Sequence, residues 1–496
     1  MNLTKGSPFS LERMISIALD LSAEKDFNML MRKILLEAMD TCNCDAGTVY
    51  LLEGEHLHFH TLFTKSKGIP APEEQKKSDL PPVPLVRTHV CACCAMDKKK
   101  INLPDIYEST EYDFKGAQKY DAINNYRTGS MLVIPMSDEK DDVIGVLQLI
   151  NAMDDTGRTI PFDKDLEEIV QALASLAAVS INNHKLAQEI NDLLHSFVQV
   201  MVDAIDTRSS YNANHTRSMV RYGNRFINWL NENDRGWKFN PDEKEVLLMS
   251  VWLHDIGKLL VPADVLDKAN RLQGIEEGIR NRVEIGCLKE EIDALKDPAN
   301  KDVCLEKAAK LKEAFAAFKE ADQKSFLDND MVEKINAYAK LTCQNAAGEQ
   351  IPLLTEKERK SLTVQKGTLT EEEKGEVEKH VVYTQRLLEK MNFRGVYKDV
   401  PRLAGAHHEY IDGSGYPHHV GDGALSKENR LITILDIYDA LTAEDRPYKP
   451  AIPSQKAFSI LYAMCEEGKL DKDIVSLFEE SGAWNNAASW PDEVAG

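Results

Sequence analysis

The chain has 496 residues, enough for about three average domains, and 43% of them are hydrophobic. This composition is typical of a globular protein and excludes a mostly disordered or fibrous chain. Lysine and arginine total 60 while aspartate and glutamate total 81, so the net charge at neutral pH is −21. Because such a charge repels nucleic acid polymers and anionic lipid surfaces, neither is an expected partner. An anionic small substrate would need local compensation from metal ions or from clustered lysine and arginine.

Targeting and redox signals point to a cytoplasmic protein. The longest apolar stretch, residues 172–181, is far shorter than the roughly 20 residues that a membrane span needs. The first residues, MNLTKGSPFSLERM, lack the apolar core of a signal peptide. The nine cysteines are odd in number and unevenly spread, which argues against a disulfide framework and favours a reducing compartment.

The first 160 residues predict an α+β domain with an antiparallel sheet. An amphipathic helix is expected over residues 15–39, followed by strands at 48–52, 56–63, 130–136 and 143–150. The inward positions of the helix are expected to be Ile17, Leu21, Phe27, Leu30, Ile34 and Leu35.

A long helix is expected to begin at Phe162 or Asp163 and to run beyond Val200. Part of it follows a seven-residue repeat, which comprises Leu166, Ile169, Leu173, Leu176, Ile190, Leu194 and Phe197. Two interpretations stay open for its first half: packing against its own sheet, or dimerisation. From Ala187 onward the repeat favours a dimer-forming helix that joins two domains, so a homodimer is predicted.

The second half predicts an all-helical domain. Residues of about 270–365 are richer in Lys, Glu and Ala and suggest an inserted helical hairpin, whose task could be to cap the active site, to dimerise or to bind a partner. The predicted domains are a sensor domain at 1–185, a helical linker at 186–200 and a metal-dependent domain at 201–496.

Three segments of this second half carry candidate metal ligands. His254 and Asp255 lie in VWLHDIGK, and His407 and His408 open HHEYIDGSGYP. Asp436 lies in ITILDIYDAL, where apolar neighbours predict burial. A buried carboxylate needs a partner because an unpaired buried charge is very costly, and a metal ion is the natural one.

Two more histidines complete the set. His215 lies at the start of a probable helix, and His380 follows Thr370 and Glu373, which form a capping box. Six or seven imidazole and carboxylate ligands exceed the needs of one tetrahedral ion and indicate a two-metal site for displacement at phosphorus. The alternative, scattered surface histidines, does not explain their apolar and glycine-turn contexts.

These residues, together with Lys258 and the later RPYK segment at 446–449, resemble the HD-GYP family, a branch of the HD-domain phosphohydrolases. The resemblance covers most of residues 195–480 outside the insertion. The first half resembles a GAF sensor domain through its element order and segments such as SMLVIPM and VIGVLQLINA.

The resemblance implies a fold, an activity and a set of roles. HD-GYP proteins are all-helical and hydrolyse cyclic di-GMP at a bi- or trinuclear metal centre. By position, Asp255 would bridge two ions and hold the nucleophilic water, and Lys258 would contact the scissile phosphate. The implied ligands are His215, His254, Asp255, His380, His407, His408 and Asp436, and the implied substrate-binding residues are Lys258, Tyr416, Arg446 and Lys449. The neighbours Asp412, Gly413, Gly415 and Pro417 are expected to shape a turn.

One departure concerns the number of metals. Trinuclear members carry a glutamate four residues before the first ligand histidine, and this chain has Tyr211 there. We therefore expect two divalent ions, with iron and manganese both suited to the ligands.

The sensor half offers weaker signals. His56, His58 and His60 alternate along a strand, which indicates a solvated face more than a metal or haem site. Cys91, Cys93 and Cys94 crowd together, but adjacent cysteines are awkward ligands for one tetrahedral zinc. The segment after Asn151 does not support binding of a cyclic nucleotide, and the ligand of the GAF domain is left open.

The sequence thus predicts a multidomain protein: an α+β GAF domain joined by a long helix to an all-α HD-GYP domain. The predicted activity is metal-dependent hydrolysis of cyclic di-GMP to linear pGpG, with GMP as a further product left open. The alternatives are a non-catalytic cyclic-dinucleotide receptor and a phosphodiesterase for another cyclic dinucleotide such as cyclic GMP-AMP.

Overall fold

The computed structural model describes residues 11–24, 26–71, 80–208, 214–443 and 451–485. The chain divides into two compact units, residues 1–194 and 195–496. This division falls inside the predicted linker at 186–200, while the predicted domain boundaries themselves remain predictions. No helix in the described ranges is long and apolar enough to cross a membrane.

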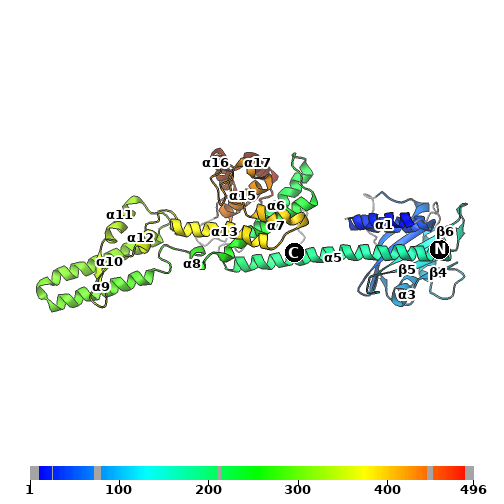
Figure 1. Cartoon of the computed structure of the whole chain (residues 1–496), viewed down its shortest axis with the longest axis horizontal. Coiled ribbons are helices and arrows are strands. Elements are labelled where there is room, and N and C mark those ends of the chain that lie inside the picture. The colour runs from blue at the N-terminus through cyan, green and yellow to red at the C-terminus, as the bar shows by residue number, and fades with distance from the viewer. Residues whose placement is uncertain (1–10, 25, 72–79, 209–213, 444–450, 486–496) are drawn as a thin grey trace. The chain divides into compact units, whose positions relative to one another are not determined.

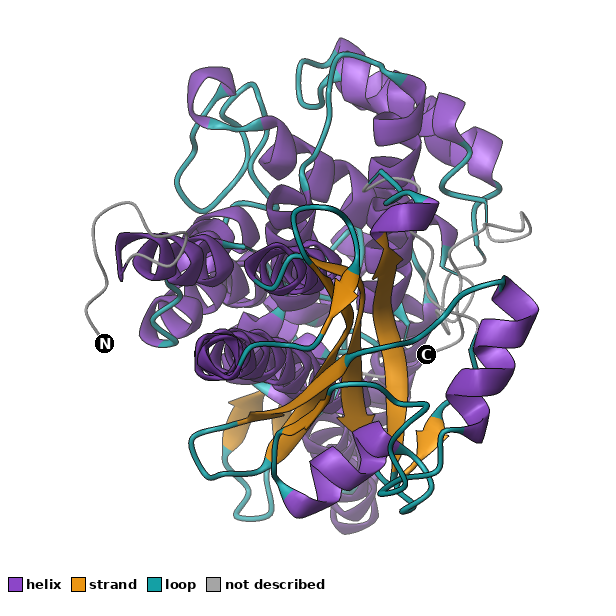
Figure 2. Ribbon diagram, turned by 90° about the vertical axis from the view of Figure 1, so that its right-hand side faces the viewer, coloured by secondary structure: helices purple, strands orange, loops and turns teal. Residues whose placement is uncertain are grey.

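The first unit is built on one antiparallel sheet with the strand order β3-β2-β1-β6-β5-β4, in which β7 pairs with β6 (Figure 2). Four strands confirm the predicted ones: β1 (Cys44–Glu53), β2 (His56–Thr64), β5 (Met131–Ser137) and β6 (Val143–Met153). Three short strands were not predicted: β3 (Val83–Pro84), β4 (Ile101–Leu103) and β7 (Thr159–Ile160). Two or three residues are too few to show an alternating pattern.

The predicted helix over 15–39 is wrong in one respect, because the structure breaks it into α1 (Leu11–Ala23) and α2 (Phe27–Thr41). Asp26 has an extended backbone, and its Oδ1 accepts a hydrogen bond from the Met29 amide at 2.7 Å. An aspartate in this position is a favourable N-cap, so a new helix starts there. All six positions expected to face inward belong to or pack against the core of this unit.

Each face of the sheet covers a separate core. Leu132 and Ile134 pack with α2 and the start of α5, whereas Met131 and Val133 pack on the opposite side with α3 (Val90–Asp97). This alternation follows from the two-residue period of a strand. A further helix, α4 (Lys115–Asn124), belongs to the segment that connects β4 to β5.

The long helix α5 (Lys164–Arg208) confirms the predicted extent (Figure 1). Its first part packs against the sheet, with Val170, Leu173 and Ile181 buried, so the packing interpretation holds there. Farther along, Leu193 is 70% exposed, while Leu194 is only half-buried. The exposed stripe therefore runs through Leu193, one residue before the predicted Leu194.

The second unit consists mainly of helices around a core that includes Phe226, Tyr438 and Phe478. These helices are α6 (His215–Asn233), α7 (Pro241–Leu253), α8 (Ala263–Leu266), α13 (Glu371–Lys390), α14 (Val400–Ala404), α15 (Lys427–Thr442), α16 (Ser454–Glu466) and α17 (Lys472–Ser481). A 3-10 turn, η3 (Ile256–Leu260), follows α7.

The insertion forms a subdomain with its own buried core around Leu272, Phe318 and Ile335. It comprises α9 (Glu276–Lys296), α10 (Lys301–Gln323), α11 (Asn329–Tyr338), α12 (Glu356–Leu362) and a strand pair, β8 (Thr342–Gln344) and β9 (Gln350–Pro352). The helices α9 and α10 form the predicted hairpin (Figure 1). The strand pair departs from the all-helical expectation, because three-residue strands closed by a short turn leave little pattern in the sequence.

Candidate metal centre

Five segments far apart in sequence supply the candidate ligands. His215 opens α6, His254 and Asp255 follow α7, His380 lies on α13, and His407 and His408 follow α14. Asp436 lies on α15. Local signals fix the starts of these helices: Asn240 with Glu243, and Thr370 with Glu373, form complete capping boxes. The predicted capping box before His380 is therefore confirmed.

Asp255 lies at the centre of the cluster. Its Oδ2 is 2.5 Å from Lys258 Nζ, 3.3 Å from His254 Nε2 and 4.0 Å from His215 Nε2. Its Oδ1 is 3.4 Å from His380 Nε2 and 3.9 Å from His407 Nε2. The two carboxylate oxygens thus face two different groups of histidines.

A second carboxylate joins the same two groups. Asp436 Oδ1 is 3.2 Å from His215 Nε2, and its Oδ2 is 3.5 Å from His408 Nδ1. Two sets of three residues, His215 with His254 and Asp255, and His380 with His407 and His408, each bring their ligand atoms within 4.8 Å of one another. All seven predicted ligands therefore meet in one place.

Three histidines share one orientation. His254, His380 and His407 each place Nδ1 at 2.7 Å from the carbonyl oxygen three residues earlier, at Val251, Val377 and Ala404. A carbonyl oxygen only accepts, so each Nδ1 carries the proton and donates it. The lone pair of each ring then lies on Nε2, the atom that faces Asp255. Histidines that ligate metals are commonly oriented by such a hydrogen bond.

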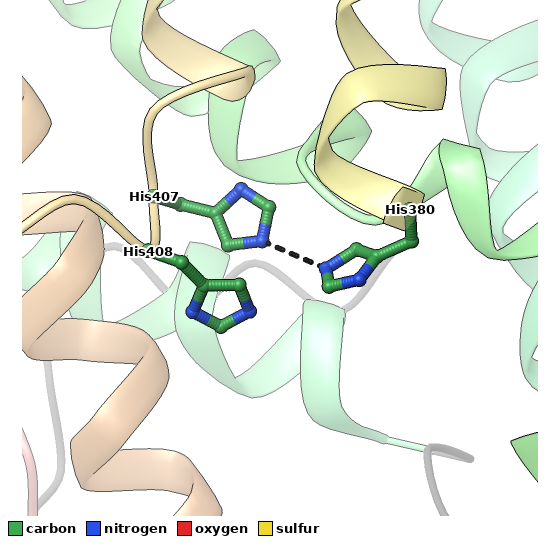
Figure 3. A group of neighbouring side chains, drawn as sticks. All are labelled: His380, His407 and His408. Carbon is green, nitrogen blue, oxygen red and sulfur yellow. Dashed lines mark hydrogen bonds between the residues drawn. The ribbon is translucent and has the colours of Figure 1, made fainter. Parts of the chain in front are cut away.

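In this orientation the Nε2 lone pairs of these histidines face one another or face no hydrogen-bond donor at all among the described residues. Nε2 of His380 lies 3.3 Å from Nε2 of His407 (Figure 3), yet both atoms are acceptors in the assigned tautomers. Nε2 of His254 is fully buried and has no hydrogen-bond partner within the described part of the chain. Buried acceptors that face one another are costly, and a shared cation would satisfy them. The donor set therefore fits bound divalent metal ions.

The protonation states of His380 and His407 agree with this interpretation. Burial lowers the pKa of His380 to about 4 and holds the pKa of His407 well below its usual range, so both rings are neutral at pH 7, as candidate ligands must be. Burial would raise the pKa of Asp255, but the positive charge of Lys258 outweighs it and holds this pKa well below the usual range. Burial would lower the pKa of His215, but hydrogen bonds to Asp436 and Asp439 raise it to about 10. This ring is therefore protonated at pH 7 without metal and would have to release a proton to a metal ion bound at Nε2.

Tight backbone packing holds two ligand segments together. The Thr384 hydroxyl on α13 donates to the His254 carbonyl oxygen at 2.8 Å and accepts from the Gly257 amide at 2.9 Å. A Cβ at Gly257 would overlap the His380 carbonyl oxygen and lie 2.5 Å from the Thr384 nitrogen. Glycine at 257 therefore allows η3 to approach α13 and brings Asp255 next to His380.

The loop that holds the GYP residues, 415–417, is packed just as tightly against neighbouring backbone. A Cβ at Gly415 would overlap the carbonyl oxygen of His408 and lie 2.5 Å from the Glu409 Cα. The buried Glu409 carboxylate accepts hydrogen bonds from the amides of His418 and Val420, at 2.6 and 3.2 Å. Gly415 is one of the residues expected to shape the turn, and Glu409 was not predicted to take part. The Tyr416 ring lies 4.8 Å from the His408 ring and so borders the cluster, while its contact with substrate stays a prediction.

Some predicted residues fall outside the described parts of the chain. Arg446 and Lys449 lie in the undescribed range 444–450, and Tyr211 lies in 209–213. Lys258 is next to Asp255, and its side chain is 17% exposed.

Sequence reasoning assigned no role to Asp439 or Thr384. Asp439 Oδ2 accepts a hydrogen bond from His215 Nδ1 at 2.7 Å and is 3% exposed, so it orients that ring. The spacing from Asp436 to Asp439 places both on one face of a helix and could have indicated this pairing. Thr384 gave no such signal, because the residues it contacts, Gly257 and His254, lie 127 and 130 positions away from it in the chain.

The first unit contains a cavity of about 460 Å³, within the range of small-molecule sites. Its lining includes Tyr50, Phe59, Phe114, Tyr126 and Gln148. The Tyr50 hydroxyl donates to Gln148 Oε1 at 2.8 Å.

The weaker sensor signals gain no metal or redox support. Cys91, Cys93 and Cys94 are buried on α3, and burial raises the pKa of Cys91 to about 11, which disfavours the reactive thiolate. His56 is exposed, and His58 and His60 are half-buried, with the His60 ring 5.2 Å from that of Phe27. The predicted solvated strand face therefore holds for His56 and only in part for His58 and His60.

Comparisons with known proteins agree with the geometry. Residues 26–181 match the GAF domain family, and residues 357–474 match an HD domain family. A 3'3'-cGAMP-specific phosphodiesterase 3 of Vibrio cholerae is 45% identical over 95 residues, 19% of this chain and 20% of that protein. The cyclic di-GMP phosphodiesterase response regulator RpfG of Xanthomonas campestris is 34% identical over 110 residues, 22% of this chain and 28% of that protein. The chain thus spans less than a third of the length of these curated relatives.

Two solved structures are similar to about a third of this chain. A GAF domain/HD domain protein from Geobacter sulfurreducens is 17% identical, covers 34% of this chain and 98% of its own length, and has a TM-score of 0.26. A GAF domain from an Acinetobacter phosphoenolpyruvate-protein phosphotransferase is 13% identical, covers 36% of this chain and 96% of its own length, and has a TM-score of 0.28.

The two family matches show that the chain joins a GAF domain to an HD domain. Its HHE and GYP residues give the HD domain the HD-GYP signature. The HD match begins at residue 357 and leaves out His215 and the His254–Asp255 pair, which the fold brings next to His380 and His407 of the matched segment.

Proposed function

We propose that this chain is a metal-dependent phosphodiesterase that hydrolyses cyclic di-GMP to linear pGpG, with further cleavage to GMP as a second step. The observation that carries the proposal is the meeting of seven ligand-type side chains, with Asp255 among them and Lys258 beside it. Relatives named cyclic di-GMP phosphodiesterases support it, including one from Vibrio cholerae that is 33% identical over 108 residues.

Two divalent ions bound here would supply the Lewis-acid chemistry that activates water and neutralises phosphate charge. His254, His380 and His407 would hold them through Nε2, because each Nδ1 is committed to a carbonyl oxygen. The carboxylate of Asp255 faces both histidine groups and is placed to contact both ions.

Lys258 would act on the substrate. Its ammonium group lies on the Asp255 carboxylate, and its partial exposure allows contact with a phosphate oxygen as charge develops there. Tyr416 borders the same cluster and offers an aromatic face to a base. The phosphate-binding roles of Arg446 and Lys449 remain predictions from the family resemblance.

The ligand set favours iron or manganese as the two metals. Imidazole nitrogen and carboxylate oxygen are suited to both, and five histidines with two carboxylates leave open positions for water and substrate. We propose two ions and not three, because position 211 holds a tyrosine where trinuclear members of the family carry a glutamate.

A second candidate substrate is 3'3'-cyclic GMP-AMP, because the 45% identical relative is named for it. Both molecules are cyclic dinucleotides with two phosphodiesters, so the same centre could act on either. A non-catalytic receptor is the remaining alternative; the complete ligand set and Lys258 argue against it.

The cavity of the first unit supports a regulatory role for the GAF domain. Its mostly apolar and aromatic lining, with the Tyr50–Gln148 pair, suits a small organic ligand. We propose that occupancy of this cavity controls the phosphodiesterase.

We further propose a homodimer formed through α5. Five apolar residues recur at spacings of four and three along one exposed face, the pattern of a coiled-coil seam: Leu186, Ile190, Leu193, Phe197 and Val200, between 46% and 70% exposed. Asn183 lies seven residues before Ile190 and would add a polar residue that fixes the register.

The nine free cysteines support a reducing cytoplasm.

The test is turnover of cyclic di-GMP and of 3'3'-cyclic GMP-AMP by the full chain, prepared without oxygen and supplied with Fe(II) or Mn(II). Chromatography should show pGpG as the first product, faster than any product from cyclic GMP-AMP. Faster cleavage of cyclic GMP-AMP would make that molecule the substrate. Tight binding of either without turnover would replace the enzyme by the receptor.

A further inference from the structure

The insertion carries an exposed apolar face on α9. Leu288, Ile292 and Leu295 are 58%, 43% and 83% exposed, and Ile285 is half-buried. These four residues follow one another at spacings of three, four and three, which places them on one side of the helix as the a and d positions of a heptad repeat. We call them the α9 stripe.

The opposite side of α9 is already occupied. Its buried residues are Ile279, Val283, Gly286, Cys287, Glu290 and Ala294, which fall at the b, c and f positions of the same heptad. A Cβ at Gly286 would lie 2.8 Å from Cys343 Cβ and 3.0 Å from Leu311 Cδ1, so this side packs tightly on β8 and α10. The α9 stripe therefore faces away from the subdomain core on a helix that is already folded.

Charges flank the α9 stripe in an ordered way. The g positions hold Glu284 and Glu291, and the e positions hold Lys289 and Lys296. In a parallel pair of identical helices, each g residue meets the e residue five positions later on the partner. Glu284 would then meet Lys289, and Glu291 would meet Lys296, on both sides of the seam. In an antiparallel pair, lysine would face lysine and glutamate would face glutamate.

We infer that the α9 stripe binds the same stripe of a second copy of this chain, with the two α9 helices parallel and in register. The charge pattern selects this occupant, because it complements itself only in that arrangement. Glu291 lies 3.5 Å from Lys312 of its own chain, but both side chains are well exposed, and such pairs contribute little. Two heptads would be too short to pair as isolated peptides, whereas α9 has its helical structure fixed by the packing on its other side.

The contact is tested in the full chain by disulfide cross-linking. Leu288→Cys and Leu295→Cys are made separately, with Lys310→Cys on the exposed surface of α10 as the matched control. The parent chain measures the background from the native cysteines, of which Cys465 alone is not buried. Mild oxidation should link most of each d-position variant into covalent pairs and leave Lys310→Cys at background. Equal cross-linking of all three variants would overturn the inference.

Charge reversal tests the orientation and separates this contact from dimerisation through α5. In the Leu295→Cys background, Glu284→Lys with Glu291→Lys makes the flanks all basic, and Lys289→Glu with Lys296→Glu makes them all acidic. Each set alone should lose most of its cross-linking. A mixture of the two should regain it, because every g–e contact is then complementary. Unchanged cross-linking in either set alone would overturn the parallel pairing.

Discussion

Nε2 of His380 and Nε2 of His407 lie 3.3 Å apart, although each ring donates its other nitrogen proton to a backbone carbonyl oxygen. Two imidazole lone pairs therefore face one another inside the protein. Each of these bonds is local, because each carbonyl belongs to the residue three positions earlier in the chain. A bound cation turns this repulsion into coordination, and the centre is therefore expected to be more stable with metal than without it.

Removal of one buried ligand should separate metal binding from folding. His254→Ala is expected to lower the metal content and to abolish turnover while the helical circular dichroism stays unchanged, because the ring loses only a local hydrogen bond from Nδ1 to the Val251 carbonyl oxygen and Nε2 has none to lose. Metal analysis and product chromatography measure both effects. His195→Ala is the control, since His195 pairs with Glu245 through a partly exposed side chain. Normal metal content in His254→Ala would rule out the ligand assignment.

Loss of Asp439, which orients the candidate ligand His215, should weaken metal binding less than loss of a ligand itself. Asp439→Asn keeps the shape of the side chain but removes the charge that orients His215. Loss of such a partner typically costs about 10- to 100-fold in metal affinity or activity. Titration of the metal-free protein with Mn(II) measures the affinity. Asp412→Asn, in which the amide oxygen can still accept from the Ser414 amide, should leave the affinity unchanged.

Because η3 approaches α13 closely, adding a single methyl group at Gly257 should destabilise the protein. Gly257→Ala would place Cβ against the His380 carbonyl oxygen, so the two segments must move apart. Overpacking of this kind costs about 1–3 kcal/mol of unfolding free energy, and the separation should also weaken metal binding. Chemical denaturation checks the first effect. The control is Gly375→Ala on α13, where nothing lies within 4 Å and alanine should stabilise the helix slightly. Equal stability of the two variants would contradict the packing argument.

An ion pair at the base of the insertion predicts a dependence on pH. Burial would raise the pKa of Glu373, but its hydrogen bonds to Lys268, at 2.8 Å, outweigh it and lower the pKa below the ordinary 4.5. A lowered folded-state pKa adds stability that is present above pH 4.5 and is lost as the pH falls through the folded-state value.

Glu373→Gln keeps an oxygen for the capping box but removes the charge. It should cost about 1.5–3 kcal/mol of unfolding free energy at neutral pH, as for other hydrogen bonds to charged groups. The cost should shrink as the pH falls below 4.5, which denaturation at several pH values measures. Glu371→Gln, exposed in the same turn, should show at most a small cost. A cost independent of pH would exclude the electrostatic explanation.

The dimer proposed through α5 has its own test. Ile190→Glu with Phe197→Glu places charges on the exposed seam and should raise the dimer dissociation constant more than about tenfold. Gln188→Glu with Gln199→Glu adds the same charge to other exposed positions of this helix and should have little effect. Analytical ultracentrifugation of each full chain compares them. Equal dissociation constants for the two double variants would exclude the seam.

The sequence by itself was sufficient to predict local features. Four strands, the extent of α5 and the capping box of Thr370 with Glu373 depend on neighbours within a few residues, and all are confirmed. The ligand types were also visible, because histidine pairs and an aspartate among apolar residues are unusual locally. The break at Asp26 was missed, since the apolar period continues across it while the cap forms through a single side chain.

Only the tertiary structure brought the site together. The insertion separates Asp255 from His380, and His215 meets Asp439 across 224 residues, so no local period can report these contacts. The hydroxyl of Thr384 and the space at Gly257 acquire their meaning only when α13 lies on η3. Residue types set which atoms can bind metal, whereas long-range packing decides which of those atoms face one another and which face of α9 stays exposed.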